Sequence, residues 1–84
     1  MQDTWYVYLL RCADGTLYCG ATNDLERRLE RHTRRQVRYT RGRLPVEMVY
    51  AAAAPDPGGR SEAQRLEAQL KRLSRADKLL LVGG

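Results

Sequence analysis

The Asp14-Gly15 pair, which lies between two apolar segments that each contain tyrosine, constrains the fold of this chain more than any other feature. Asp-Gly is a strong turn signal, and the segment before it, from Trp5 to Cys12, is aromatic, β-branched and leucine-rich. Apolar side chains occupy both alternating faces of that segment, so we expect a central strand that is covered on both sides. Residues 16–20 form a second short strand, and the two strands make a β-hairpin.

The length of the hairpin loop decides which tyrosines share a face of the sheet. A two-residue loop at Asp14-Gly15 places Tyr8 and Tyr18 on opposite faces. A three-residue loop that begins at Ala13 places both tyrosines on one face, and it requires Gly15 in the left-handed conformation. The φ angle of Gly15 together with the cross-strand pairing distinguishes the two registers.

A helix is predicted over residues 23–32, directly after the hairpin. Asn23 is a suitable N-cap, and Glu26 three residues later makes the pair similar to a capping box. With about 100° of rotation per residue, Leu25 and Leu29 define the stripe that faces the sheet.

Arg28 and His32 fall on the edge of that inward stripe, so we expect both side chains to lie toward the sheet. Each residue also has an ordinary structural explanation. An arginine at such a boundary can lay its aliphatic stem on apolar surface and keep its charge in water. A histidine there can be a boundary residue whose hydrogen bonds are satisfied.

The remaining residues predict one more strand and two helices. We expect residues 33–43 to be a basic loop with a short helix near Gln36–Thr40, and residues 46–52 to be a strand entered through Leu44-Pro45. The glycine- and proline-rich segment 55–59 is a loop.

Two helices follow that loop. Ser61, with Gln64 three residues later, is the expected N-cap of the first. Its buried stripe is Ala63, Leu66, Leu70 and Leu73. A last turn or short helix over 75–81 packs its leucines on the core.

Length and composition indicate one soluble domain that covers residues 1–84. No apolar run reaches the roughly 20 residues of a membrane span, and the first residues lack the pattern of a signal peptide, so we expect no membrane contact and a cytoplasmic location. Two cysteines, Cys12 and Cys19, are too few for a disulfide scaffold, and with one histidine they make a poor zinc site. Oligomeric state is not indicated.

The basic residues are mostly arginine, and they are concentrated in one segment. The formal net charge is +5, and eight arginines lie between Arg27 and Arg43 with Glu30 as the only acid. Arginine binds phosphate groups in a bidentate manner, so we expect a polyanionic partner, nucleic acid in particular. The alternative is a solvated arginine-rich surface. The candidate phosphate contacts are Arg27, Arg31, Arg34, Arg35, Arg38, Arg41 and Arg43.

Several common kinds of catalytic site are absent from the sequence. There is no serine–histidine–acid set, no phosphate-binding glycine loop and no carboxylate cluster for two metals. Only Glu67, among the acids, has a partly buried helical position, and its alternative role is an i,i+4 pair with Lys71. Phosphodiester hydrolysis needs a base, positive charge at the phosphorane and a hard cation, which tyrosine, arginine and one carboxylate can together provide.

The order of these groups resembles the GIY-YIG endonuclease superfamily, specifically its small stand-alone, single-domain branch. The resemblance covers Trp5 to about Leu80, nearly the whole chain, and no single motif carries it alone. The blocks that resemble family motifs are Tyr6-Val7-Tyr8, Tyr18-Cys19-Gly20, the arginine helix over 23–32, Tyr39-Thr40, Arg43-Leu44-Pro45, Val49-Tyr50 and Ser61 to Glu67 with Lys71.

The resemblance implies an α+β fold with a small three-stranded, mainly antiparallel sheet flanked by helices. It implies DNA cleavage with one divalent ion, magnesium or manganese, held by Glu67 as its only protein ligand. By position, Tyr18 is the implied general base, and Tyr8 orients the water or the phosphate or shares the base role. Arg28 stabilises the phosphorane, and His32 lies where the family places Tyr or His near the scissile phosphate.

Two positions depart from the family pattern. Tyr6 replaces the glycine of the first motif, and Ala21 stands where many members have a lysine or a hydroxyl residue, which removes one contact to phosphate or water. Arg28 and Glu67 are retained, so we expect an active enzyme, with a non-catalytic nucleic-acid-binding module as the alternative. Single-stranded or locally distorted DNA is the expected substrate of one small domain.

Overall fold

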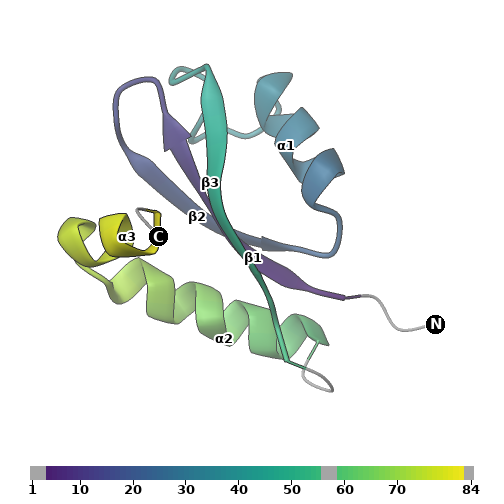
Figure 1. Cartoon of the computed structure of the whole chain (residues 1–84). Helices are drawn as coiled ribbons and strands as arrows, with labels where there is room; N and C mark the ends of the chain where they lie inside the picture. Colours follow the sequence, from purple (N-terminus) through teal and green to yellow (C-terminus); the bar gives the residue numbers. More distant parts are fainter. Residues whose placement is uncertain (1–3, 56–58, 83–84) are drawn as a thin grey trace.

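The computed structural model of this chain describes residues 4–55 and 59–82. Its elements are, in chain order, β1 (Tyr6–Cys12), β2 (Leu17–Thr22), α1 (Leu25–Thr33), β3 (Val46–Ala53), α2 (Gly59–Arg72) and α3 (Arg75–Val82) (Figure 1). The strands form one sheet in the order β2-β1-β3, and both neighbouring pairs are antiparallel. The predicted α+β fold class and the central position of the first strand are therefore confirmed.

The hairpin between β1 and β2 has the three-residue loop. Gly15 has a φ of +85°, and its amide donates to the carbonyl of Cys12 at 2.9 Å, as the Cys12 amide does to Thr16. In the resulting register Tyr8 lies opposite Gly20 and Leu10 lies opposite Tyr18. Because side chains alternate along a strand, Tyr8 and Tyr18 share one face of the sheet.

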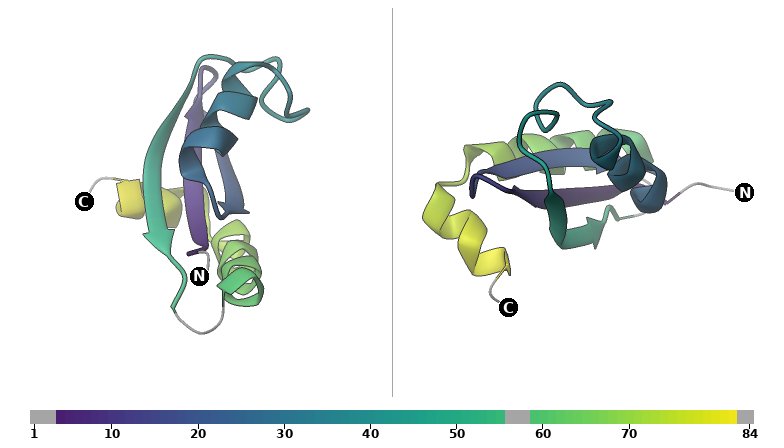
Figure 2. Two further views of the ribbon diagram at one scale, coloured as in Figure 1. Left: turned by 90° about the vertical axis from the view of Figure 1, so that its right-hand side faces the viewer. Right: turned by 90° about the horizontal axis from the view of Figure 1, so that it is seen from above.

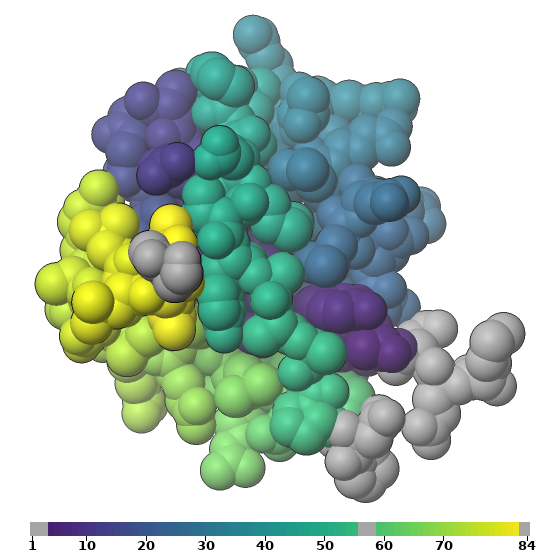
Figure 3. All heavy atoms as spheres, viewed as in Figure 1, coloured from purple at the N-terminus to yellow at the C-terminus, as the bar shows by residue number. Residues whose placement is uncertain are grey.

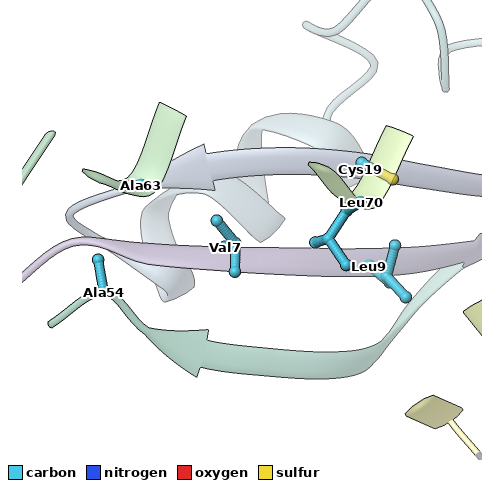
Figure 4. Close-up of a cluster of buried hydrophobic side chains, with 6 residues drawn as sticks. All are labelled: Val7, Leu9, Cys19, Ala54, Ala63 and Leu70. Carbon is cyan, nitrogen blue, oxygen red and sulfur yellow. The ribbon is translucent and has the colours of Figure 1, made fainter. Parts of the chain in front are cut away.

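The two faces of the sheet have different cover. Figure 1 shows α1 on one side of the diagonal strands and α2 with α3 on the other. The face toward α2 is the apolar core, where Val7 and Leu9 of β1 pack with β2 and α2 (Figure 4). The buried members of this core are Val7, Leu9, Cys19, Ala54, Ala63 and Leu70.

The β2 edge of the sheet differs from the β3 edge. Figure 2 shows α2 beside β2, with β3 at the opposite edge of the sheet. In the space-filling view, β3 crosses the middle of the visible surface between α3 and α1 (Figure 3). Among the described residues, no helix is long and apolar enough to span a bilayer.

Neither predicted N-cap, Asn23 or Ser61, is the residue that caps its helix. Asp24 is the N-cap of α1, and its carboxylate accepts the Arg27 amide at 3.1 Å. A carboxylate at this position also interacts favourably with the helix dipole, which the amide of Asn23 does not. Helix α2 already begins at Gly59, so Ser61 lies in its first turn. Part of the predicted loop, residues 56–58, lies outside the described chain.

The C-terminal helix and the basic loop also differ from the expectations. Leu79 and Leu80 are exposed, and only Leu81, among the three consecutive leucines, packs with the core, because neighbouring residues on a helix point about 100° apart. The short helix expected at 36–40 is replaced by turns. The third strand is confirmed and runs one residue further than predicted, to Ala53.

We expect Gly15→Ala to destabilise the protein by about 1–2 kcal/mol, because a Cβ atom disfavours the left-handed backbone that this turn uses. Gly15→Asn should cost less, since asparagine tolerates that conformation. Urea denaturation of the three proteins measures the difference. Equal midpoints for Gly15→Ala and the wild type would contradict the assigned loop.

Candidate active site

Tyr8, in the middle of the central strand, is the centre of a buried polar cluster. Its side chain is fully buried, and its hydroxyl accepts a hydrogen bond from Nε of Arg28 at 3.1 Å. The same oxygen lies 3.3 Å from Nε2 of His32. Arg28 and His32 are four residues apart, so one face of α1 presents both groups to the same phenol.

Helix α1 buries its histidine more deeply than its leucines. His32 is fully buried, whereas Leu25 and Leu29 are only half-buried. The sequence placed His32 at the edge of the inward stripe, but the phenol of Tyr8 gives the ring a partner inside the protein. A buried polar group with a partner avoids the cost of desolvation without a hydrogen bond.

Gly20 makes room for the phenol ring. It lies directly opposite Tyr8 on β2, and a Cβ atom built at Gly20 would overlap the Tyr8 hydroxyl and ring. Sequence analysis assigned no role to this glycine beyond its motif. A glycine inside a strand is itself a signal of close approach by another group, and here that group is the Tyr8 side chain.

Thr40 is a member of the cluster that sequence analysis did not assign. It is fully buried, and its Oγ1 lies 2.7 Å from Nδ1 of His32 and 3.5 Å from the carbonyl oxygen of Val37. Thr40 lies in the irregular loop between α1 and β3, where no periodic pattern distinguishes a buried residue from an exposed one. Its position next to the motif tyrosine was the only available signal.

One arrangement of hydrogens gives the Tyr8 hydroxyl, the His32 ring and the Thr40 hydroxyl each an acceptor. Arg28 donates to the Tyr8 oxygen, the Tyr8 hydroxyl donates to Nε2 of His32, Nδ1–H donates to Thr40, and Thr40 donates to the Val37 carbonyl. In the opposite tautomer, the hydroxyl hydrogen of Tyr8 lacks an acceptor within the cluster. We therefore assign the Nδ1–H tautomer to His32.

The pKa values agree with a neutral ring beside a neutral phenol. Burial, with a smaller effect of the neighbouring Arg28 and Arg31 charges, lowers the pKa of His32 from 6.5 to about 4. Burial raises the pKa of Tyr8 although Arg28 acts to lower it. For Arg28 burial lowers the pKa, but its interactions with the Tyr8 and Tyr18 hydroxyls outweigh that effect and raise it. The guanidinium is thus the charged group of the cluster.

Tyr18 forms the accessible side of the cluster. It is half-buried, and its ring centroid lies 5.0 Å from that of His32 and 6.3 Å from that of Tyr8. On the outer side it packs against Tyr39, with 5.2 Å between the centroids. Of the two predicted tyrosines, Tyr18 is therefore the one that solvent reaches.

Glu67 reaches the same region from α2. Its negative charge contributes to the raised pKa of Tyr8, so the carboxylate lies within electrostatic range of the cluster formed by the other four predicted catalytic residues. The carboxylate forms an ion pair with Nζ of Lys71 at 2.9 Å, and the Glu67 side chain keeps 23% of its exposure. The ordinary i,i+4 pair considered for Glu67 is thus present.

A single divalent cation fits these residues. No group of three or more potential ligands from His, Cys, Asp and Glu exists in the part of the chain that the structure describes. Magnesium commonly keeps several waters and binds through one or two carboxylates plus substrate phosphate, so one accessible glutamate suffices. The Lys71 ammonium already shows that a cation reaches Glu67.

The seven arginines predicted to bind nucleic acid fall into two groups. Arg27 and Arg31, together with Arg28, line a cleft of about 480 Å³ between Trp5, the end of β2 and α1. Ala21 also lines this cleft. The other five do not: Arg34 pairs with Glu30 at 2.6 Å, Arg43 pairs with Asp14 at 3.0 Å, and Arg35, Arg38 and Arg41 are exposed in the loop.

Comparisons with known proteins agree with this arrangement. A family model described as the GIY-YIG catalytic domain matches residues 4–79. The chain is 58% identical over 79 residues to a UPF0213 protein of Nitratidesulfovibrio vulgaris, which covers 93% of this chain and 69% of that protein. A UPF0213 protein of Vibrio cholerae is 43% identical over 85 residues, 100% of this chain and 82% of that protein.

A solved structure is also similar. The solution NMR structure of the UPF0213 protein BH0048 from Bacillus halodurans has a TM-score of 0.58 and 42% identity. The match covers 95% of this chain and 83% of that one. The fold is thus shared over nearly the whole length of this chain.

We expect the free energy of unfolding to decrease as pH falls from about 6.5 to about 4, by at most about 3 kcal/mol. In that window the unfolded chain protonates His32 and the folded protein does not, so protons favour unfolding. Urea titrations at several pH values measure this slope. A His32→Gln variant, which cannot titrate there, should show a smaller slope, and an equal slope in both proteins would contradict the assignment.

Thr40→Val should destabilise the protein by about 1–3 kcal/mol, because it keeps the shape of Thr40 but leaves Nδ1–H of His32 without an acceptor. Thr40→Ser, which keeps the hydroxyl, should cost less. Nitrogen NMR of the imidazole should show the Nδ1–H tautomer in the wild type. Full stability of Thr40→Val would show that the hydrogen bond is not needed.

Proposed function

The chain belongs to the GIY-YIG family, and from that premise we propose that it is a divalent-metal-dependent endonuclease that hydrolyses DNA phosphodiester bonds. The observation that carries the proposal is the position of the Arg28 guanidinium. It donates to the buried Tyr8 phenol, interacts with the accessible Tyr18 phenol and lies at a cleft lined by further arginines. A cation held in this way is suited to a phosphorane.

In the proposed mechanism, Tyr18 acts as a phenolate that takes the proton of the attacking water and becomes a neutral phenol, since its side chain is the accessible one of the two in the site. Arg28 binds the non-bridging phosphate oxygens and stabilises the charge that develops on them. A magnesium or manganese ion bound at Glu67 would supply Lewis-acid stabilisation of the phosphate and leaving oxygen. The Lys71 ammonium would have to be displaced from the Glu67 carboxylate by the metal ion.

Tyr8 and His32 act in this proposal as positioning residues. Both are fully buried, whereas Arg28 and Tyr18 are only half-buried, so the latter two are the groups of the cluster that a substrate can contact. Tyr8 fixes Arg28 through its hydrogen bond, and the neutral His32 ring fixes the orientation of the Tyr8 hydroxyl. This arrangement preorganises the guanidinium before the substrate arrives.

We expect the wild type to cleave labelled single-stranded or branched DNA in the presence of magnesium or manganese. Glu67→Gln should abolish cleavage, because the amide retains the shape but loses the charge that holds the metal. Arg28→Lys should reduce the rate about 10²–10³-fold. Product formation on denaturing gels, compared with the same strand annealed to its complement, measures both rate and strand preference.

Glu62→Gln is the matched control, since Glu62 is also a half-buried carboxylate of α2 but pairs with Arg65 at 3.8 Å. It should cleave as the wild type does. Absence of cleavage by the wild type, or equal cleavage by Glu67→Gln, would leave the non-catalytic nucleic-acid-binding module as the better explanation.

A further inference from the structure

A second cleft includes Tyr18 and shares no lining residue with the arginine-lined cleft. It has a volume of about 280 Å³, between the beginning of β2 and the two C-terminal helices. A smaller hollow of about 230 Å³ adjoins it and shares Leu17, Tyr39 and Lys78. We name the larger one the Tyr39 cleft; its lining residues are Leu17, Tyr18, Cys19, Tyr39, Lys71 and Lys78.

The Tyr39 cleft is continuous with the proposed active site. Tyr18, the proposed base, lines it directly, and so does Lys71, the ion-pair partner of Glu67. A molecule in this cleft would therefore lie next to the reacting phosphate. Sequence analysis gave no role to Lys78, and it treated Tyr39 only as part of a family block.

Tyr39 is an exposed aromatic ring that is held in place. It keeps 41% of its exposure and is one of three large hydrophobic side chains that are exposed in the described chain. The guanidinium of Arg43 lies 4.4 Å from its ring centroid, and Tyr18 packs at 5.2 Å. An immobilised aromatic ring at a basic cleft is the usual platform for an unpaired nucleobase.

Lys78 supplies a cation whose charge is not already neutralised. Lys71 is paired with Glu67 at 2.9 Å, and Arg75 donates to the Gly15 carbonyl at 2.8 Å. Within residues 4–55 and 59–82, no acidic side chain forms an ion pair with Lys78. A lysine ammonium acts on phosphate as a point charge, so this position suits a backbone phosphate.

We infer that the Tyr39 cleft is a nucleotide subsite that binds one unpaired nucleotide flanking the scissile phosphate, with its base on Tyr39 and its phosphate on Lys78. This inference rests on the proposed function, and it specifies the substrate as single-stranded at this position. A paired base cannot present its face to an aromatic ring, because its neighbours in the duplex already stack on it.

The two clefts define a path along β2 for a single nucleic-acid strand. The arginine-lined cleft includes Ala21 and Thr22 at one end of β2, and the Tyr39 cleft includes Leu17 and Cys19 at the other. The six residues of β2 cover roughly 17 Å at about 3.3 Å per residue. A single nucleic-acid strand that occupies both clefts would thus pass Arg28 and Tyr18.

Binding of a fluorescent single-stranded oligonucleotide, followed by anisotropy in metal-free buffer that prevents turnover and keeps the Glu67–Lys71 ion pair, tests the subsite. Lys78→Ala should weaken binding and reduce the slope of log K against log salt by about 0.7, the value for one phosphate contact on a single strand. Tyr39→Leu should weaken binding about fivefold to a hundredfold. Tyr39→Phe keeps the ring and should bind as the parent does.

Arg72→Ala is the matched control for charge, since Arg72 is an exposed cation of α2 that does not line the cleft. It should leave the salt slope unchanged. If Lys78→Ala and Tyr39→Leu, both shown by circular dichroism to be folded, bind like the parent, the subsite is wrong. Equal losses with Arg72→Ala would likewise overturn it, because they would indicate non-specific attraction.

The binding experiment tests the subsite, and the cleavage assay tests the proposed nuclease activity, so the two proposals can fail independently. Loss of binding in Lys78→Ala together with an inactive wild type would support the subsite and refute the proposed activity. Active wild type with unchanged binding in the variants would support the activity and refute the subsite. Binding of a fully paired oligonucleotide should be insensitive to Tyr39→Leu, and an equal effect on duplex and single strand would contradict base stacking.

Discussion

The hydrogen bonds of the buried Tyr8 hydroxyl determine how α1 is attached to the sheet. Tyr8 lies on the central strand, and Arg28 and His32 reach it from one face of the helix. All three groups are polar, and two are fully buried, so removal of any one takes a hydrogen-bond partner from at least one other in a region of low dielectric constant. The same contacts that hold the helix thus also aim the guanidinium.

The two faces of the sheet differ in the chemistry of the side chains that they bury. Val7 and Leu9 point to α2 and form an apolar core, whereas Tyr8 points to α1 and joins a polar cluster. Because successive side chains of a strand point to opposite faces, β1 alone supplies residues to both. One face of the sheet is therefore an apolar core, and the other carries the hydrogen-bonded groups of the candidate site.

Local chemistry predicted much of the fold, and tertiary contacts explain the rest. The register of the hairpin depends on one left-handed glycine, Gly15, and that requirement is visible in the sequence. The burial of His32 was underestimated because its partner Thr40 lies eight residues away in an irregular loop. Glu67 and Lys71 were paired correctly by helical spacing, but the position of Glu67 near Tyr8 depends on how α2 packs on β2.

The central place of β1 in the sheet has a consequence for the nascent chain. β1 is made early, but its second neighbour, β3, follows only after residue 45, and α2, which carries Glu67, comes later still. A growing chain that has reached residue 45 already contains Tyr8, Tyr18 and Arg28. It still lacks β3, one of the two strands that pair with β1. Contacts of this sequence separation cannot form before their later member is synthesised. Glu67 and Arg28 can therefore come together only after α2 has been made, later than the hairpin and α1.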